Sequence, residues 1–289
     1  MNEPRPVAVD HDGLRHVALD WGGTGEPLLL LHPNGLCAGF FDPLARRLTD
    51  LYRVVGIDLR GHGGSEPPPT RAGLQYVPMA GDVVAVLDAL GIGEFSAVGE
   101  SLGGGVGAVV DRLSPGRLRR LVLCEGIAFD SHAFPQGHVP GEGGSGNYMA
   151  ELARARRAVW PDRHSVRDRY ASRAPFDVVA PEALDAYLRW GFFDRADGQV
   201  ELACAPETEA SIFEVTSESG GAAVAFDHLA MMRGRVSVFH GDTSYLPKPW
   251  FQAQADAVGA QLHTIPGGHF FLQEDTARGE AIVRTALGR

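Results

Sequence analysis

The chain has 289 residues, of which 44% are hydrophobic and 21% are charged, a composition typical of a globular protein. Its formal net charge of -10 disfavours nucleic acid and anionic membranes as partners, because both bind basic protein surfaces. The N-terminal stretch contains no apolar core and no segment is apolar enough to span a bilayer, so we expect neither a signal peptide nor a membrane span. The widely separated Cys37, Cys124 and Cys204 predict neither a disulfide framework nor a metal site, and they favour a cytoplasmic location.

Apolar runs and helical patterns alternate in the first part of the chain, up to Glu125. Residues 1–14 are polar, and we expect a loose lead-in there. The predicted strands cover residues 15–21, 27–31, 53–59, 95–98 and 118–124. The predicted helices between them cover residues 40–51, 77–90 and 104–113. Strands that alternate with helices predict a parallel sheet with right-handed crossover connections.

The alternation stops after Glu125 and resumes near residue 236. Residues 127–147 are rich in glycine, proline and histidine and are predicted to form a loop. Beyond them, helical patterns and one brief strand pattern cover residues 148–160, 164–173, 181–190, 200–202, 210–213 and 221–232. Two further strands and two helices are predicted at residues 236–240, 249–258, 261–265 and 274–287. We therefore expect a core of residues 1–126 and 226–289, interrupted by a helical cap of residues 127–225 over the strand ends.

A Gly-x-Ser-x-Gly motif, GESLG, lies between the predicted strand at 95–98 and the predicted helix at 104–113. Strand, sharp turn and helix are the context in which this motif forms a nucleophile elbow. Gly99 and Gly103 lack the Cβ atoms that would collide where the strand and the helix cross. The motif therefore predicts Ser101 as a nucleophile above the sheet, with the N–H of Leu102 directed to where an oxyanion forms.

Polar groups follow several other predicted strands, and the carboxyl ends of parallel strands meet at one edge of a sheet. The segments are HPNG at 32–35, DLRGHG at 58–63, Glu125, GDTS at 241–244 and His269. A serine hydroxyl needs a base to take its proton, and a carboxylate must orient that base. Serine, acid and histidine also occur here in the chain order that an elbow enzyme uses.

From about Arg15 to its end the chain resembles the α/β-hydrolase superfamily, on the segments LLLLHPNG, DLRGHGGS, GESLG and PGGHFF. The resemblance implies an α/β-hydrolase fold: a mostly parallel eight-stranded sheet flanked by helices, with a helical cap inserted after the sixth strand. It implies Ser101 as nucleophile, His269 as general base, and an oxyanion hole formed by the N–H groups of Leu102 and Asn34. It implies no cofactor and no metal. Many members have His-Gly where this chain has His32 followed by proline, which has no N–H. The expected donor is the N–H of Asn34, one residue after the proline, so the oxyanion hole is retained.

Two carboxylates compete for the third position of the triad. Asp242 directly follows Gly241, and the later positions where the superfamily more usually carries its acid hold no carboxylate here. Glu125 ends the strand after the elbow helix, and neighbouring strands lie only about 5 Å apart. An acid at the end of this strand is a feature in which the chain resembles haloalkane dehalogenases and certain lactonases. We favour Glu125, with Asp242 as the alternative, and expect a Glu125 oxygen within about 3.2 Å of a ring nitrogen of His269.

These residues predict a cytoplasmic serine hydrolase that acts on a small-molecule ester, lactone or similar acyl compound. Carbon–carbon bond hydrolysis and the acyl transfer or cyclisation of secondary metabolism use the same groups and stay open. A non-catalytic ligand receptor on a hydrolase fold is an alternative of another class. The residues that we expect in the substrate pocket are His32, Cys37, Trp160, Tyr187 and Trp190.

Overall fold

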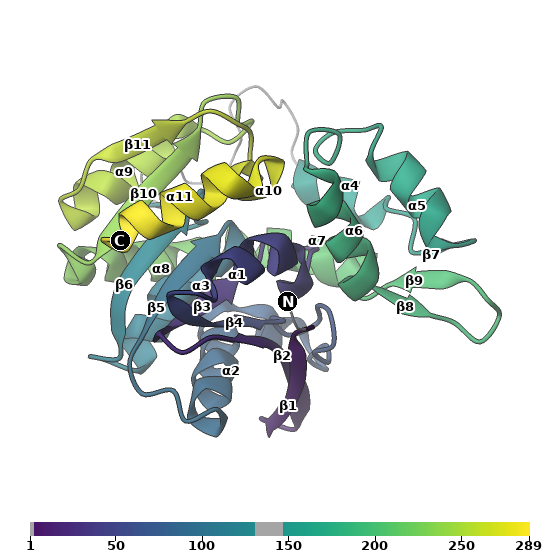
Figure 1. Ribbon diagram of the computed structural model, residues 1–289, viewed down its shortest axis with the longest axis horizontal. Coiled ribbons are helices and arrows are strands. Elements are labelled where there is room, and N and C mark those ends of the chain that lie inside the picture. Colours follow the sequence, from purple (N-terminus) through teal and green to yellow (C-terminus); the bar gives the residue numbers. More distant parts are fainter. Residues whose placement is uncertain (1–2, 131–146) are drawn as a thin grey trace.

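An eight-stranded sheet runs through the centre of the computed structural model, which describes residues 3–130 and 147–289 (Figure 1). The strands are β1 (Arg5–His11), β2 (Leu14–Gly22), β3 (Glu26–Leu31), β4 (Tyr52–Ile57), β5 (Phe95–Glu100), β6 (Leu118–Cys124), β10 (Val236–Gly241) and β11 (Leu262–Ile265). Their order is β1-β2-β4-β3-β5-β6-β10-β11, and only β2 pairs with its neighbours in the antiparallel sense. The predicted mostly parallel sheet of eight strands is thus confirmed.

The expectation of a loose lead-in at residues 1–14 is wrong. Residues 5–11 form β1, which pairs along its whole length with β2, from Arg5 opposite Asp20 to His11 opposite Leu14. Most of its side chains are exposed, so the strand lacks the apolar alternation that would reveal it in the sequence. Asp12 and Gly13, both with positive φ, form the tight turn between the two strands. An Asp-Gly pair is a characteristic hairpin turn, and it is the signal that could have predicted β1.

Helices cover both faces of the sheet, because its central strands are apolar on both sides. In β3, Leu28 and Leu30 pack on one face and Leu29 and Leu31 on the other. The first face carries α1 (Asp42–Leu48) and α11 (Thr276–Ala286), and the second carries α2 (Tyr76–Ala89), α3 (Leu102–Leu113), α8 (Ala222–Leu229) and α9 (Lys248–Val258). Short helices complete this part: η1 (Ala38–Phe41), η2 (Arg71–Leu74), η3 (Ala230–Met232) and α10 (Phe271–Glu274). No helix in the described part of the chain is both long and apolar enough to cross a bilayer.

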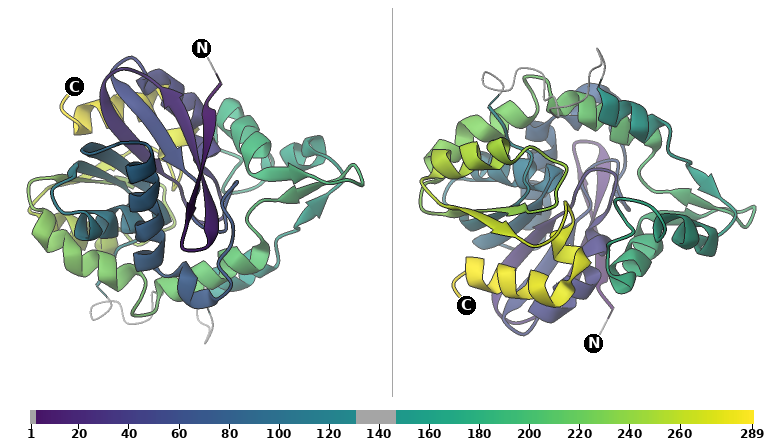
Figure 2. Two further views of the ribbon diagram at one scale, coloured as in Figure 1. Left: turned by 90° about the horizontal axis from the view of Figure 1, so that it is seen from below. Right: turned by 90° about the horizontal axis from the view of Figure 1, so that it is seen from above.

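A second lobe, which we define as residues 148–216, stands beside the sheet and projects away from it in both views of Figure 2. Its elements are α4 (Tyr148–Arg154), β7 (Val159–Trp160), α5 (Arg163–Tyr170), α6 (Pro181–Trp190), β8 (Phe192–Asp194), β9 (Val200–Leu202) and α7 (Pro206–Thr216). The three short strands form their own antiparallel sheet in the order β7-β9-β8. The apolar core of the lobe includes Leu36, Phe40 of η1 and Phe270, all from segments beside the main sheet, which fixes the lobe against the strand ends.

The lobe differs from the sequence expectation in two places. The helix predicted at residues 148–160 ends at Arg154, and residues 159–160 instead pair with β9 as β7. Strand β8 was not predicted, because a strand of three residues is too short to show alternation. The loop predicted at residues 127–147 lies largely outside the described residues, which resume at Asn147.

Candidate active site

Ser101 lies between the end of β5 and the start of α3, with φ 53° and ψ -121°. A positive φ is strained for a residue that carries a Cβ, and such strain persists only where neighbouring groups hold the backbone. Here the Ser101 N–H donates to the Cys124 carbonyl at 3.1 Å, and the Ser101 carbonyl accepts from the Ile127 N–H at 2.8 Å. The turn is therefore fixed by the neighbouring strand β6 and the segment that follows it.

The glycines on either side of Ser101 have the steric role that the motif predicts. A Cβ on Gly99 would lie 2.5 Å from the Cα of Gly104, and one on Gly103 would lie 2.1 Å from the carbonyl oxygen of Leu31. Neither position has room for a side chain, because the helix crosses the strand ends at backbone contact. This close crossing presents Ser101 at the carboxyl edge of the sheet.

Glu125 follows the last residue of β6 and is fully buried. Its Oε1 accepts hydrogen bonds from Nδ1 of His240 at 2.8 Å and from the Gly241 N–H at 2.9 Å. Its Oε2 accepts from Nδ1 of His269 and from the Ser244 hydroxyl, both at 2.7 Å. Burial raises the pKa of this carboxyl, but the hydrogen bonds from the two histidines outweigh burial and hold the pKa at about 2. The site therefore contains an ionised carboxylate that accepts four hydrogen bonds.

The contact expected between Glu125 and His269 is thus present, and Asp242 makes a different one. The Oδ1 of Asp242 accepts from the Gly267 N–H at 2.9 Å, while its own backbone N–H donates to the Ile265 carbonyl at 2.8 Å. Asp242 consequently connects β10 to the loop that carries His269. The point of contact is Gly267, two residues before the histidine. The direct hydrogen bond to the ring comes from Glu125.

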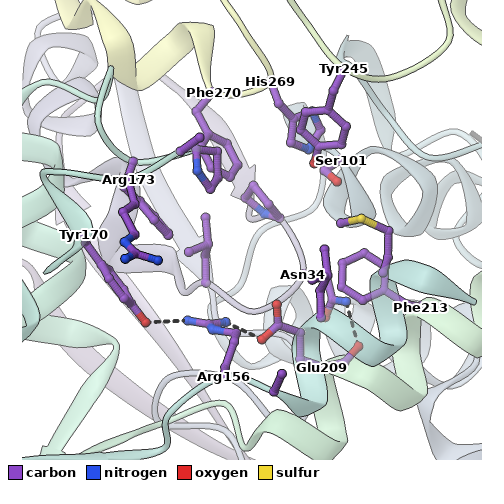
Figure 3. Close-up of a pocket in the computed structure, with 18 of the residues that line it drawn as sticks. Asn34, Ser101, Arg156, Tyr170, Arg173, Glu209, Phe213, Tyr245, His269 and Phe270 are labelled. Carbon is purple, nitrogen blue, oxygen red and sulfur yellow. Dashed lines mark hydrogen bonds and ion pairs between the residues drawn. The ribbon is translucent and has the colours of Figure 1, made fainter. Parts of the chain in front are cut away.

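His269 follows β11 in the glycine-rich loop that the sequence predicts. The Gly268 N–H donates to Oε1 of Glu274 at 2.8 Å, which holds the loop in place. Nδ1 of His269 donates a hydrogen bond to an ionised carboxylate, so the ring proton of the neutral imidazole is on Nδ1. Nε2 of the same ring can therefore accept a proton. Figure 3 shows the ring next to Ser101, with the ring of Tyr245 beside it at a centroid distance of 5.4 Å.

His240 is one of the site residues that the sequence did not lead us to predict. It lies in β10, one residue before Gly241, and the pattern predicts an ordinary core or edge histidine. Instead its Nδ1 donates to Glu125, and its ring stacks on Phe251 with the centroids 5.1 Å apart. The position next to the end of a central strand was the available signal, because such ends converge on the site.

The loop after β3 is held by two buried histidines, the first of which is His32. Its Nδ1 donates to the Pro33 carbonyl at 2.8 Å, and its Nε2 accepts from the Leu59 N–H at 2.9 Å. Burial, followed by the neighbouring His62, places the pKa of His32 well below its usual range. A neutral, doubly hydrogen-bonded His32 fixes the backbone just before Asn34.

The second histidine, His62, acts on the same loop. Its Nε2 accepts from the Gly35 N–H at 3.0 Å, and burial lowers its pKa to about 4. Asn34 is held by its side chain, whose Nδ2 donates to the Glu209 carbonyl in α7 at 2.9 Å. Within the described part of the chain, the backbone N–H of Asn34 has no hydrogen-bond acceptor. The N–H of Leu102 is the first of α3, and the first N–H groups of a helix have no intrahelical acceptor.

Two adjoining cavities meet at Ser101 and His269. The smaller, of about 80 Å³, is lined by Asn34, Ser101, Leu102, Tyr245 and His269 together with apolar residues behind the elbow. The larger, of about 690 Å³, shares most of these residues and extends beneath the lobe (Figure 3). Its lobe wall consists of aromatic, aliphatic and arginine side chains, among them Trp160, Tyr170, Arg173, Phe176 and Phe213. All four residues predicted for the nucleophile, base and oxyanion hole therefore line one common space.

The predicted pocket residues need correction. Trp160 lines the large cavity, but His32, Cys37, Tyr187 and Trp190 are not among the described residues that line either cavity. His32 and Cys37 are fully buried behind the loop. Trp190 packs on η1, where a Cβ on Gly39 would lie 2.3 Å from the Trp190 side chain. The ring of Trp190, which we expected in the pocket wall, instead packs between the lobe and the main sheet.

Tyr187 has a polar function that its aromatic character did not predict. Its hydroxyl donates to the Gly35 carbonyl at 3.0 Å and accepts from Nη2 of Arg156 at 3.0 Å. Arg156 also donates to the hydroxyl of Tyr170 at 3.1 Å and forms an ion pair with Glu209. This network, visible in part in Figure 3, joins α6 and α7 of the lobe to the loop after β3.

Comparison with known proteins gives three results. The sequence profile of the alpha/beta hydrolase fold matches residues 26–199. A dihydrolipoyllysine-residue acetyltransferase component of an acetoin cleaving system from Cupriavidus necator is 38% identical over 125 residues, which are 42% of this chain and 32% of that protein. A putative carbamate hydrolase RutD from Caulobacter segnis is 34% identical over 116 residues, which are 40% of this chain and 43% of that protein. The chain thus spans less than half the length of these curated relatives.

A crystal structure of E-2-(acetamidomethylene)succinate hydrolase has the same fold throughout. It superposes with a TM-score of 0.82 over 99% of this chain and 100% of that one. The two sequences are 18% identical, so the likeness is one of fold.

Proposed function

We propose that this chain, which belongs to the alpha/beta hydrolase fold family, is a serine hydrolase that cleaves an ester, lactone or related acyl compound through an acyl-enzyme on Ser101. The observation that carries the proposal is the hydrogen bond of 2.7 Å between the buried Glu125 carboxylate and Nδ1 of His269. It leaves Nε2 of the same ring as a proton acceptor beside a strained serine. Relatives named as hydrolases support the general activity.

In the first half of the reaction, Oγ of Ser101 attacks the substrate carbonyl carbon and its proton passes to Nε2 of His269. The carbonyl π electrons move to oxygen, and the N–H groups of Leu102 and Asn34 donate to that oxyanion. Glu125 stays ionised and stabilises the imidazolium, as its pKa of about 2 allows. The tetrahedral intermediate then expels the leaving group, which takes the proton from His269, and the acyl group remains on Ser101.

In the second half, His269 takes a proton from a water molecule that attacks the acyl-enzyme. The same two N–H groups hold the second oxyanion. When this intermediate collapses, the proton returns from His269 to Oγ of Ser101 and the carboxylic acid departs. The sequence of steps regenerates the free enzyme and consumes one water per acyl group.

We further propose that the lobe, residues 148–216, acts as the cap that selects the substrate. The expected cap of residues 127–225 extends too far at its C-terminal end, because α8 packs on the main sheet. The support is that α4, α5 and α7 supply much of the wall of the large cavity, while the strand ends supply the reacting groups. Changes on the lobe wall are therefore expected to alter substrate range more than the chemistry.

The proposal is tested by hydrolysis of p-nitrophenyl esters of graded acyl length, with Ser101→Ala as the diagnostic variant. We expect Ser101→Ala to lower kcat by at least ~10³-fold without loss of folded protein. Ser114→Ala, which changes a serine at the opposite end of α3, is the matched control and should keep the wild-type rate. Ester hydrolysis that survives in Ser101→Ala would overturn the proposal. Absence of turnover for every ester, with ligand binding intact, would favour a receptor instead.

A further inference from the structure

The lobe wall of the large cavity carries a charge opposite to that of the whole protein. Its lining includes Arg156, Arg157, Arg169 and Arg173, and Glu209 is the one carboxylate among the described lining residues. The chain itself has a net charge of -10. A cationic wall in an acidic protein is therefore a local feature of this cavity.

Two of these arginines are already engaged by the protein. Arg156 pairs with Glu209 and donates to two tyrosine hydroxyls, as described above. The guanidinium carbon of Arg157 lies 4.7 Å from the ring centroid of Trp160, and its Nε donates to the Val159 carbonyl at 2.7 Å. The charge of Arg156 is thus paired, and the guanidinium of Arg157 is held against Trp160.

Arg169 and Arg173 differ, because neither guanidinium has an ion pair or a hydrogen bond with any residue that the structure describes. Arg169 lies in the last turn of α5 and Arg173 lies three residues beyond its end, and both line the cavity. Figure 3 shows the Arg173 guanidinium across the cavity from Ser101 and His269, between Tyr170 and Phe270. Elsewhere on α5, by contrast, Arg167 is paired with Asp185 at 2.6 Å.

We propose that Arg169 and Arg173 bind a carboxylate of the substrate, at the end remote from the carbonyl that Ser101 attacks. Guanidinium groups match the planar, bidentate geometry of a carboxylate. The same cavity is also lined by Phe176 and Phe270, so an apolar chain suits the part of the substrate that joins its two ends. The inference, which rests on the proposed function, names the substrate class as an acyl compound with a second, anionic end.

The test uses two esters that differ only in the remote charge. Mono-p-nitrophenyl adipate carries a free carboxylate, and methyl p-nitrophenyl adipate has that carboxylate masked. We expect wild-type kcat/KM to favour the anionic ester by roughly 10-fold, since a charge-assisted hydrogen bond contributes on this scale. In the double variant Arg169→Gln, Arg173→Gln the ratio should fall close to one, mainly through a higher KM for the anionic ester. Arg167→Gln, on the same helix but paired with Asp185, should keep the wild-type ratio.

A wild-type ratio near one, or a double variant that loses activity equally on both esters, would overturn the inference. Calorimetric titration of the Ser101→Ala variant with adipate separates this failure from a failure of the proposed function. If no ester is hydrolysed but adipate binds and the two arginine changes abolish its binding, the anion site stands and the hydrolase proposal fails. If esters are hydrolysed with no charge preference and adipate does not bind, the hydrolase proposal stands and the anion site fails.

Discussion

The two walls of the large cavity are built in opposite ways. On the strand-end wall, Ser101 and His269 are buried, and behind His269 the carboxylate oxygens of the fully buried Glu125 accept four hydrogen bonds. On the lobe wall, Arg169 and Arg173 are exposed and have no partner among the described residues. Groups that are fixed in advance suit reaction steps that need one geometry, and unpaired groups suit the binding of a ligand. The difference separates the chemistry from the selection of the substrate.

A second comparison concerns two glutamates buried behind the strand-end wall, at the ends of adjacent strands. Glu125 follows β6 and its pKa is held at about 2. Glu100 ends β5, and the one hydrogen bond that its carboxyl receives comes from Gln273, within the described residues, at 2.8 Å. Burial therefore dominates and raises the pKa of Glu100 well above its usual range. Both carboxyls are fully buried, so the number of hydrogen-bond donors around each one accounts for the opposite directions of their pKa shifts.

The largest effect is expected from removing the charge on the strand-end wall. Glu125→Gln should lower kcat by ~10²–10⁴-fold, because a neutral amide neither stabilises the imidazolium nor fixes the tautomer of His269. Asp242→Asn is the matched control, and its loss should be smaller because Asp242 contacts the loop backbone and not the ring. Steady-state kinetics on one ester measure both. A larger loss for Asp242→Asn would reassign the acid.

The same carboxylate should stabilise the fold in a pH-dependent way. Its pKa falls from 4.5 to about 2 in the folded protein, so its stabilisation is complete above pH 4.5 and is lost as the pH falls from 4.5 towards 2. From this difference in pKa, the carboxylate contributes on the order of 3 kcal/mol to the free energy of unfolding. We expect Glu125→Gln to lower the free energy of unfolding more at about pH 6 than at about pH 2.5, by denaturant titration. Equal losses at both pH values would contradict the ionised, hydrogen-bonded state.

One of the contacts between the lobe and the loop after β3 is expected to affect the chemistry. Tyr187→Phe removes the hydroxyl that donates to the Gly35 carbonyl, next to the proposed oxyanion donor Asn34. A looser donor should lower kcat by roughly 3–10-fold with little change in KM. Tyr170→Phe is the control, because Tyr170 bonds the same arginine but not Gly35. Equal kinetics for the two variants would show that the Tyr187 hydroxyl does not position this loop.

The smallest effect is expected from Glu100→Gln. A neutral carboxyl and an amide have nearly the same shape, and the amide oxygen can accept the hydrogen bond from Gln273. Activity should stay within about 3-fold of wild type and the free energy of unfolding within about 1 kcal/mol. Thermal unfolding and ester kinetics measure the two. A loss comparable with that of Glu125→Gln would mean that Glu100 also acts as an anion.

The sequence allowed the strand-end wall to be predicted because local sterics and topology decide it. The turn at Ser101 requires glycines at 99 and 103, and parallel strands bring Glu125 and His269 to one edge. His240 escaped prediction because the direction of a strand side chain near the sheet end depends on the neighbouring strand. Strand β1 escaped because it pairs with a single neighbour and buries little apolar surface.

The lobe wall could not be predicted in the same way. Tyr187 and Trp190 lie on α6, and whether such aromatics face a cavity or a core depends on how the helix packs. Both pack away from the cavity, whereas Arg169 and Arg173, which we did not predict for the site, line it. The packing of these short helices depends on residues far away in the sequence. The local sequence therefore does not indicate which of their side chains face the cavity.

The central claim, a nucleophilic Ser101 activated through His269 and Glu125, is tested most directly by covalent labelling with a fluorophosphonate. The labelled residue is identified by mass spectrometry of the digested protein. We predict one label per chain on Ser101, no label in Ser101→Ala, and much slower labelling in Glu125→Gln than in Asp242→Asn. A label on another residue, or one that persists in Ser101→Ala, would contradict the account.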